Sequence, residues 1–140
     1  MKATHQPPTT GDTTPADLLR GAALYIERHG WNQGAFFQLP TRHRLAPACA
    51  MGALRIAATG TTDSIILDDV FTQVLAAQAI LANHLEPDYD HTTDLEADLN
   101  FEVISDWNDD GDRTAAEVVT ALRDAADTWD RLHPTGGENA

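Results

Sequence analysis

The residues of this chain best suited to metal chemistry lie in one acidic stretch, DWNDDGDRTAAE, which runs from Asp106 to Glu117. Its spacing matches the loop with which an EF-hand binds calcium, including the glycine at which that loop turns sharply. Carboxylate, amide, hydroxyl and carbonyl oxygens are the ligands that calcium prefers. The pattern therefore gives the hypothesis of one calcium site. Its candidate ligands are Asp106, Asn108, Asp110, Asp112, Thr114 and Glu117.

Two features of the same stretch are typical of an ordinary interhelical turn. Thr114 is followed three residues later by Glu117, which is the spacing of a capping box at the start of a helix. Arg113 stands where paired EF-hands use an aliphatic residue, and the sequence has no second loop. We therefore favour a capped turn that binds calcium weakly or not at all, and we expect no cofactor. Calcium binding is the alternative.

Cys49 is the one cysteine and a second candidate for chemistry. It falls near the start of a predicted helix, where the helix dipole lowers the pKa of a thiol, and His43 is the nearest histidine that could act as a base. A small buried residue in a tight helix contact is the simpler interpretation, and we favour it. The sequence has no phosphate-binding glycine loop, nucleophile elbow or HExxH motif. No residue can be assigned a catalytic role, which favours a protein that is not an enzyme.

Apolar residues at helical spacing, together with caps and helix breakers, predict five helices and no convincing strand. The first begins after Thr14 and ends at Gly30, and the second begins near Pro47. The third covers about residues 63–85, the fourth begins after Thr93, and the fifth covers about 114–132. The inward face of the fifth helix is predicted to carry Val118, Leu122, Ala125, Trp129 and Leu132.

These elements predict an all-α fold in a single compact domain over residues 14–132, which fits a chain of 140 residues. The segment near residues 35–46 is expected to be an ordered loop, with a short hairpin as the alternative. Residues 1–13 are rich in proline and threonine, and residues 133–140 are similar in character. We expect the first to be a disordered arm and the second a disordered tail.

The formal net charge of −13 is distributed unevenly. Residues 1–60 carry six bases and three acids, whereas residues 61–140 carry three bases and nineteen acids. Between Glu86 and Asp112 there are eleven acids and no lysine or arginine. Such a field repels nucleic acid and anionic membranes and attracts basic proteins. With one cysteine and no apolar run after Lys2, we expect a cytoplasmic protein without direct nucleic-acid or membrane binding.

Three stretches, GWNQGAFF, CAMGALRIAA and WNDDGDRTAAEVVTALRDAAD, resemble a family of small uncharacterised helical proteins from high-GC Gram-positive bacteria and their phages. The similarity covers about residues 17–127 and implies no established activity. Relatives usually have small or proline residues at the position of Asp110, which implies that calcium binding is not the common purpose of the family. The pattern falls on Gly30, Trp31, Gln33, Gly34, Cys49, Gly52, Ala53, Leu54, Trp107, Asn108, Asp109, Thr114, Glu117 and Val118.

Composition and motifs together favour a non-catalytic protein-interaction module that presents an acidic face to a partner, which we expect to be basic. A calcium-binding protein that uses the loop from Asp106 to Glu117 is the first alternative. An acidic mimic of nucleic acid that inhibits a DNA-binding protein is the weaker alternative, suggested by the charge and by the phage-borne relatives.

Overall fold

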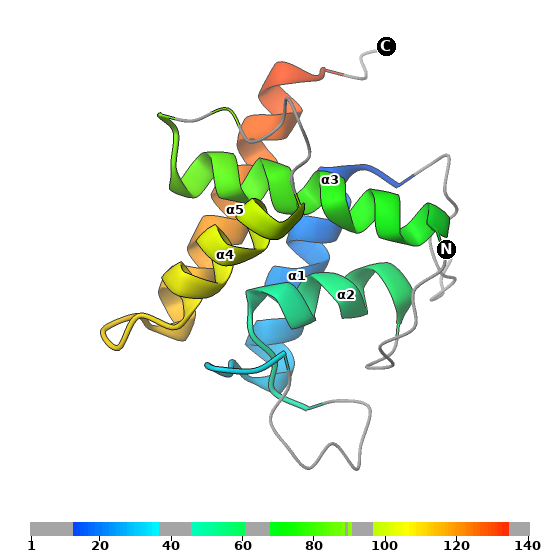
Figure 1. The fold of residues 1–140 in the computed structure, drawn as a ribbon. Helices are drawn as coiled ribbons and strands as arrows, with labels where there is room; N and C mark the ends of the chain where they lie inside the picture. Colours follow the sequence, from blue (N-terminus) through cyan, green and yellow to red (C-terminus); the bar gives the residue numbers. More distant parts are fainter. Residues whose placement is uncertain (1–12, 37–45, 61–67, 89, 91–96, 135–140) are drawn as a thin grey trace.

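The computed structural model describes residues 13–36, 46–60, 68–88, 90 and 97–134. Within these residues the chain forms five helices and no strand ladder, which confirms the predicted all-α single domain (Figure 1). The predicted arm and tail fall mostly outside the described residues, as do the candidate hairpin and the predicted starts of the third and fourth helices. The helices are α1 (Pro15–His29), α2 (Ala50–Thr59), α3 (Asp68–Leu85), α4 (Ala97–Asn108) and α5 (Ala115–Leu132).

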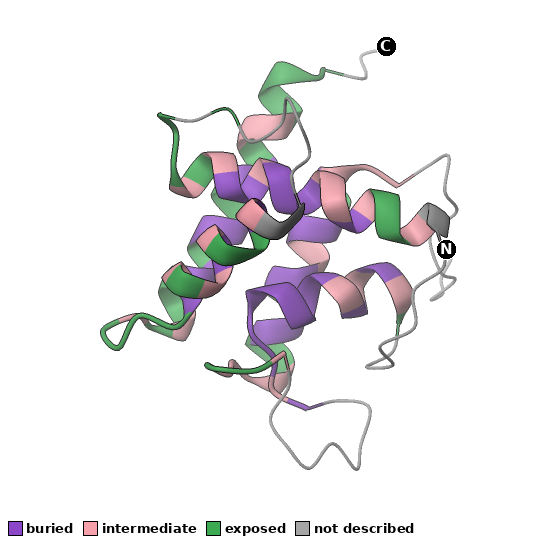
Figure 2. Ribbon diagram, in the orientation of Figure 1, coloured by how far each residue is buried: buried purple, intermediate pink, exposed green. Residues whose placement is uncertain are grey.

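Helix α1 lies at the centre of the fold and packs against α2, α3 and α5. Its start is fixed as predicted, because Thr14 accepts a hydrogen bond from the backbone N–H of Asp17 and Pro15 occupies the first turn. Its contact with α2 is close, since a Cβ added to Gly21 would lie 3.1 Å from the Cβ of Ala57. The small residues of both helices therefore bring their backbones together, and Figure 2 shows their facing sides buried.

Helix α2 begins at Ala50, three residues later than the predicted start near Pro47. The preceding residues are extended because Ala48 forms an isolated parallel bridge with Trp31. The N–H of Ala48 donates to the carbonyl of Gly30 at 3.1 Å. Gly30 has a φ of 102°, a conformation that favours glycine over residues with a side chain. Ala48, which has a high helical propensity, is thus used to hold the segment that follows α1.

The α4 and α5 helices are consecutive, but they contact different neighbours. Helix α4 packs against α3 and α2, whereas α5 packs against α1 and α3. The acidic turn between them therefore lies at a corner of the molecule, at the lower left of Figure 1. Over the described residues, no helix combines the length and the hydropathy needed to cross a bilayer.

The inward face of α5 agrees with the prediction except at its end. Val118, Leu122 and Ala125 are fully buried, and Trp129 is partly buried against the core. The prediction for Leu132 was wrong, because its side chain is 71% exposed. The last turn of α5 projects beyond the other helices (Figure 2), so helical spacing continues there without a surface to pack against.

This difference between the middle and the end of α5 predicts unequal effects of the same truncation. Leu122→Ala removes a fully buried side chain and should lower the free energy of unfolding by about 2–5 kcal/mol. Leu132→Ala, the matched control, should change it by less than about 0.5 kcal/mol. Chemical denaturation of both variants measures the two values, and equal destabilisation would show that the face of α5 has been misassigned.

Candidate functional site

The six candidate calcium ligands lie at the corner between α4 and α5, but they serve different purposes. Asn108 is the last residue of α4, and its side chain is only 1% exposed. The carboxylates of Asp106, Asp110 and Asp112 belong to exposed residues. Within the part of the chain that the structure describes, no group of three or more histidine, cysteine, aspartate or glutamate side chains is arranged to hold a metal ion.

The buried amide of Asn108 joins three segments of the chain. Its Oδ1 accepts hydrogen bonds from Trp31 Nε1 at 2.8 Å and from the backbone N–H of Ala50 at 3.0 Å. Its Nδ2 donates to the carbonyl of Asn32 at 3.1 Å and to Asp109 Oδ1 at 3.0 Å. Both acceptor positions and both donor positions of the amide are thus used. A calcium ion could recruit this side chain only by breaking that network.

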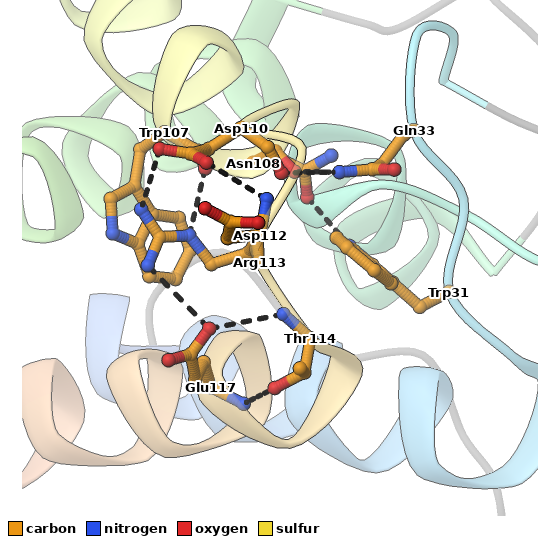
Figure 3. Close-up of polar contacts among 9 residues, drawn as sticks. All are labelled: Trp31, Gln33, Trp107, Asn108, Asp110, Asp112, Arg113, Thr114 and Glu117. Carbon is orange, nitrogen blue, oxygen red and sulfur yellow. Dashed lines mark hydrogen bonds and ion pairs between the residues drawn. The ribbon is translucent and has the colours of Figure 1, made fainter.

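The segment after α1 also holds the backbone of the turn. Gln33 Nε2 donates to the carbonyls of Asn108 at 3.1 Å and Asp110 at 2.8 Å. The N–H of Gly34 donates to Asp109 Oδ1 at 2.9 Å, and the positive φ of Gly34 is 86°. Figure 3 shows Trp31 and Gln33 reaching the turn from the opposite side. The three stretches through which the sequence resembles its family therefore meet at one place.

Arg113 supplies a positive charge inside the turn. Its guanidinium lies over the ring of Trp107, 4.2 Å from the centroid, and its Nε donates to the carbonyl of Trp107 at 2.9 Å. The same group lies 3.6 Å from a carboxylate oxygen of Glu117 and 4.0 Å from one of Asp110 (Figure 3). The Arg113 guanidinium therefore offsets the charge of carboxylates that would otherwise attract an external ion. It also caps the carbonyl end of α4. The sequence marked Arg113 only as a departure from the calcium template.

The remaining candidate ligands form the turn and the cap. Asp110 Oδ1 accepts the N–H of Asp112 at 2.9 Å, as in an Asx turn. Thr114 Oγ1 accepts the N–H of Glu117 at 3.2 Å, and the glutamate accepts the N–H of Thr114 at 3.0 Å, which confirms the predicted capping box. Gly111 does not use the left-handed conformation open to glycine. The turn is thus complete without an ion, and calcium binding stays a prediction to be tested.

Cys49 caps α2 from the residue before its first turn. Its Sγ accepts a hydrogen bond from the N–H of Gly52 at 3.3 Å, and the side chain is buried. Burial raises the pKa of the Cys49 thiol, an effect that outweighs the backbone hydrogen bonds that lower it. The predicted base, His43, lies outside the described residues. The thiol therefore acts as a structural cap, in keeping with the interpretation we favoured.

A family model matches residues 10–128, and its description is a family of unknown function, DUF6197. The chain belongs to this family. The match includes every segment of the hydrogen-bond network around Asn108, so the network lies within the DUF6197 domain. Comparisons with curated proteins and with solved structures gave no match. The function of this DUF6197 member must therefore be inferred from its geometry.

The network predicts that the DUF6197 domain is sensitive to an isosteric change at its centre. Asn108→Asp keeps both acceptor contacts but places an oxygen opposite the carbonyl of Asn32 and the carboxylate of Asp109. The free energy of unfolding should fall by about 3 kcal/mol or more. Asn32→Asp, whose side chain makes an exposed hydrogen bond to Ala35, is the matched control and should cost about 1 kcal/mol. Equal losses in denaturation experiments would contradict the central role of Asn108.

The capped-turn interpretation predicts a clear calorimetric result for this DUF6197 member. We expect a calcium dissociation constant of about a millimolar or weaker at physiological salt, both in the wild type and in Glu117→Gln. We also expect Thr114→Ala to lower stability by about 1 kcal/mol through loss of the cap. Micromolar binding in the wild type that is lost in Glu117→Gln would instead establish a calcium site.

Proposed function

We propose that this protein is a non-catalytic, cytoplasmic interaction module that binds a basic surface of a protein partner. The binding surface is the acidic face, which we define as the exposed residues with carboxylate side chains that the structure describes between residues 86 and 112. These are Glu86, Asp88, Asp90, Glu102, Asp106, Asp109, Asp110 and Asp112. The concentration of exposed negative charge on this face is the observation that carries the proposal.

The arginines that pair with acids do so mainly elsewhere. Arg20 of α1 lies 2.7 Å from Asp127 and 2.7 Å from Asp130, both on α5. Arg123 of α5 lies 2.6 Å from Glu27 of α1. These ion pairs join α1 and α5, and none of them involves a residue of α4. Of the three arginines in the described ion pairs, only Arg113 contacts a carboxylate of the acidic face, that of Asp110.

Two exposed carboxylates of α4 are available to a partner. Across the residues that the structure describes, Glu102 and Asp106 take part in no ion pair, and both are exposed. Unpaired charges of one sign accelerate association with an oppositely charged protein and give it specificity. A basic partner would therefore gain interactions here that the folded chain does not already supply.

The other polar groups support a binding role over a catalytic one. The thiol of Cys49 is buried with a raised pKa, which disfavours the thiolate that nucleophilic chemistry requires. The amide of Asn108 and the carboxylate of Glu117 are engaged in the network and the cap. These groups support the structure, whereas the acidic face remains open to a partner.

The proposal predicts an association that depends on salt and on charge. A partner captured from the native host should bind steeply more weakly as the salt concentration rises from about 0.05 M to about 0.5 M. Reversal of Asp88, Glu102, Asp106 and Asp112 to lysine should abolish binding without loss of helical circular dichroism. Surface plasmon resonance measures both effects, and binding that ignores salt and charge reversal would refute the proposal. Competition by duplex DNA for the same partner would favour the nucleic-acid mimic.

A further inference from the structure

The acidic face contains a depression with an apolar floor. It has a volume of about 460 Å³ and lies between the end of α3 and the outer side of α4. Its floor includes Leu85, Leu99, Val103 and Trp107, of which Leu85, Val103 and Trp107 also pack partly against the core. Partly exposed apolar side chains that line a hollow offer contact area to an incoming side chain.

The rim of the depression is strongly acidic. Glu86, Glu102, Asp106 and Asp110 line it, and among the described residues that line it the one base is Arg113. Glu102 and Asp106 lie four residues apart on α4, so their carboxylates project from the same side of the helix. The rim thus carries four negative charges against one positive charge. A ligand that complements both floor and rim needs a cation on an apolar stem.

We infer that this depression receives an arginine side chain from an amphipathic segment of the protein partner. The inference rests on the proposed function and names the chemistry of the partner. The methylene groups of the arginine would lie on the apolar floor, and its guanidinium would lie among the rim carboxylates. A planar guanidinium makes two parallel hydrogen bonds to a carboxylate, which an ammonium group cannot do.

The chain itself shows this mode of recognition at the edge of the same depression. The guanidinium of Arg113 lies on the ring of Trp107 and between the carboxylates of Asp110 and Glu117 (Figure 3). An aromatic surface beside carboxylates therefore already holds one guanidinium in this region. The rim carboxylates of Glu102 and Asp106 would pair in the same way with a second guanidinium, supplied by the partner.

A second depression indicates that the occupant is a chain segment rather than a small molecule. It has a volume of about 470 Å³ and shares Leu85, Trp107 and Arg113 with the first. It adds Glu117 and Asp124, so the acid-lined surface continues from α4 toward α5. A helical segment with basic residues on one face and apolar residues beside them would cover both depressions.

The probe for this inference is a fluorescently labelled helical peptide of leucine, alanine and arginine, measured by fluorescence anisotropy. In its citrulline analogue, an uncharged urea replaces each guanidinium, and in its lysine analogue the charge is kept but the planar group is lost. We expect the arginine peptide to bind, the citrulline analogue to bind at least about tenfold more weakly, and the lysine analogue to bind about threefold more weakly. Equal binding of the arginine peptide and either analogue would overturn the inference.

Two matched double variants test the location. Glu102→Gln with Asp106→Asn removes two charges from the rim, whereas Asp88→Asn with Asp112→Asn removes two charges of the acidic face that line neither depression. The rim variant should weaken binding by about tenfold and the control by less than about twofold. Leu99→Ala, which truncates the floor, should weaken binding by about threefold at high salt, where charge is screened.

The outcomes separate this inference from the proposed function. Equal weakening by the two double variants would mean that only the general field attracts the peptide, which overturns the inference and leaves the interaction module intact. If the peptide fails to bind while the native partner still binds in a salt-dependent way, the inference is overturned and the proposed function is not. A native partner insensitive to salt and to charge reversal would overturn both.

Discussion

The buried amide of Asn108 requires hydrogen-bonding partners at four positions, and two segments far apart in sequence, together with the adjacent Asp109, supply them. A buried polar group is stable only when its donors and acceptors are all satisfied. This requirement fixes the end of α4 against the start of α2 and against the segment that follows α1. The bridge between Trp31 and Ala48 and the late start of α2 belong to the same arrangement. The corner of the molecule is thus specified by one side chain and not by apolar packing alone.

In the acidic turn next to this amide, the carboxylates repel one another, and this repulsion must also be offset. Arg113 places a guanidinium near Asp110 and Glu117. In the capping box, side-chain oxygens of Thr114 and Glu117 accept backbone N–H groups at the start of α5. Four of the six candidate ligands, Asn108, Asp110, Thr114 and Glu117, therefore have side-chain partners within the chain. The carboxylates of Glu102 and Asp106 on α4 remain exposed beside this turn, as part of the acidic face.

The features predicted correctly from the sequence are those whose signals are local. The caps at Thr14 and Thr114 depend on residues three positions away, and the burial of Leu122 follows from helical spacing. The partners of Asn108 lie up to 77 residues away, so no local pattern could identify them. Helical spacing likewise did not indicate that the last turn of α5, which carries Leu132, extends beyond the other helices. Each Trp-Asn dipeptide was visible in the sequence, but the contact between Trp31 and Asn108 depends on the fold.

The long sequence separation within the corner has a consequence for the order in which the chain assembles. Helices α1 and α2 are synthesised early and can pack through Gly21 and Ala57. The indole of Trp31 and the N–H of Ala50 must nevertheless keep water as their partner until residue 108 leaves the ribosome. Contacts of such separation form late, because closing the intervening loop costs conformational entropy. The segment that follows α1 therefore acquires its fixed geometry only when α4 docks, and the N–H of Ala50 is a natural reporter of that step.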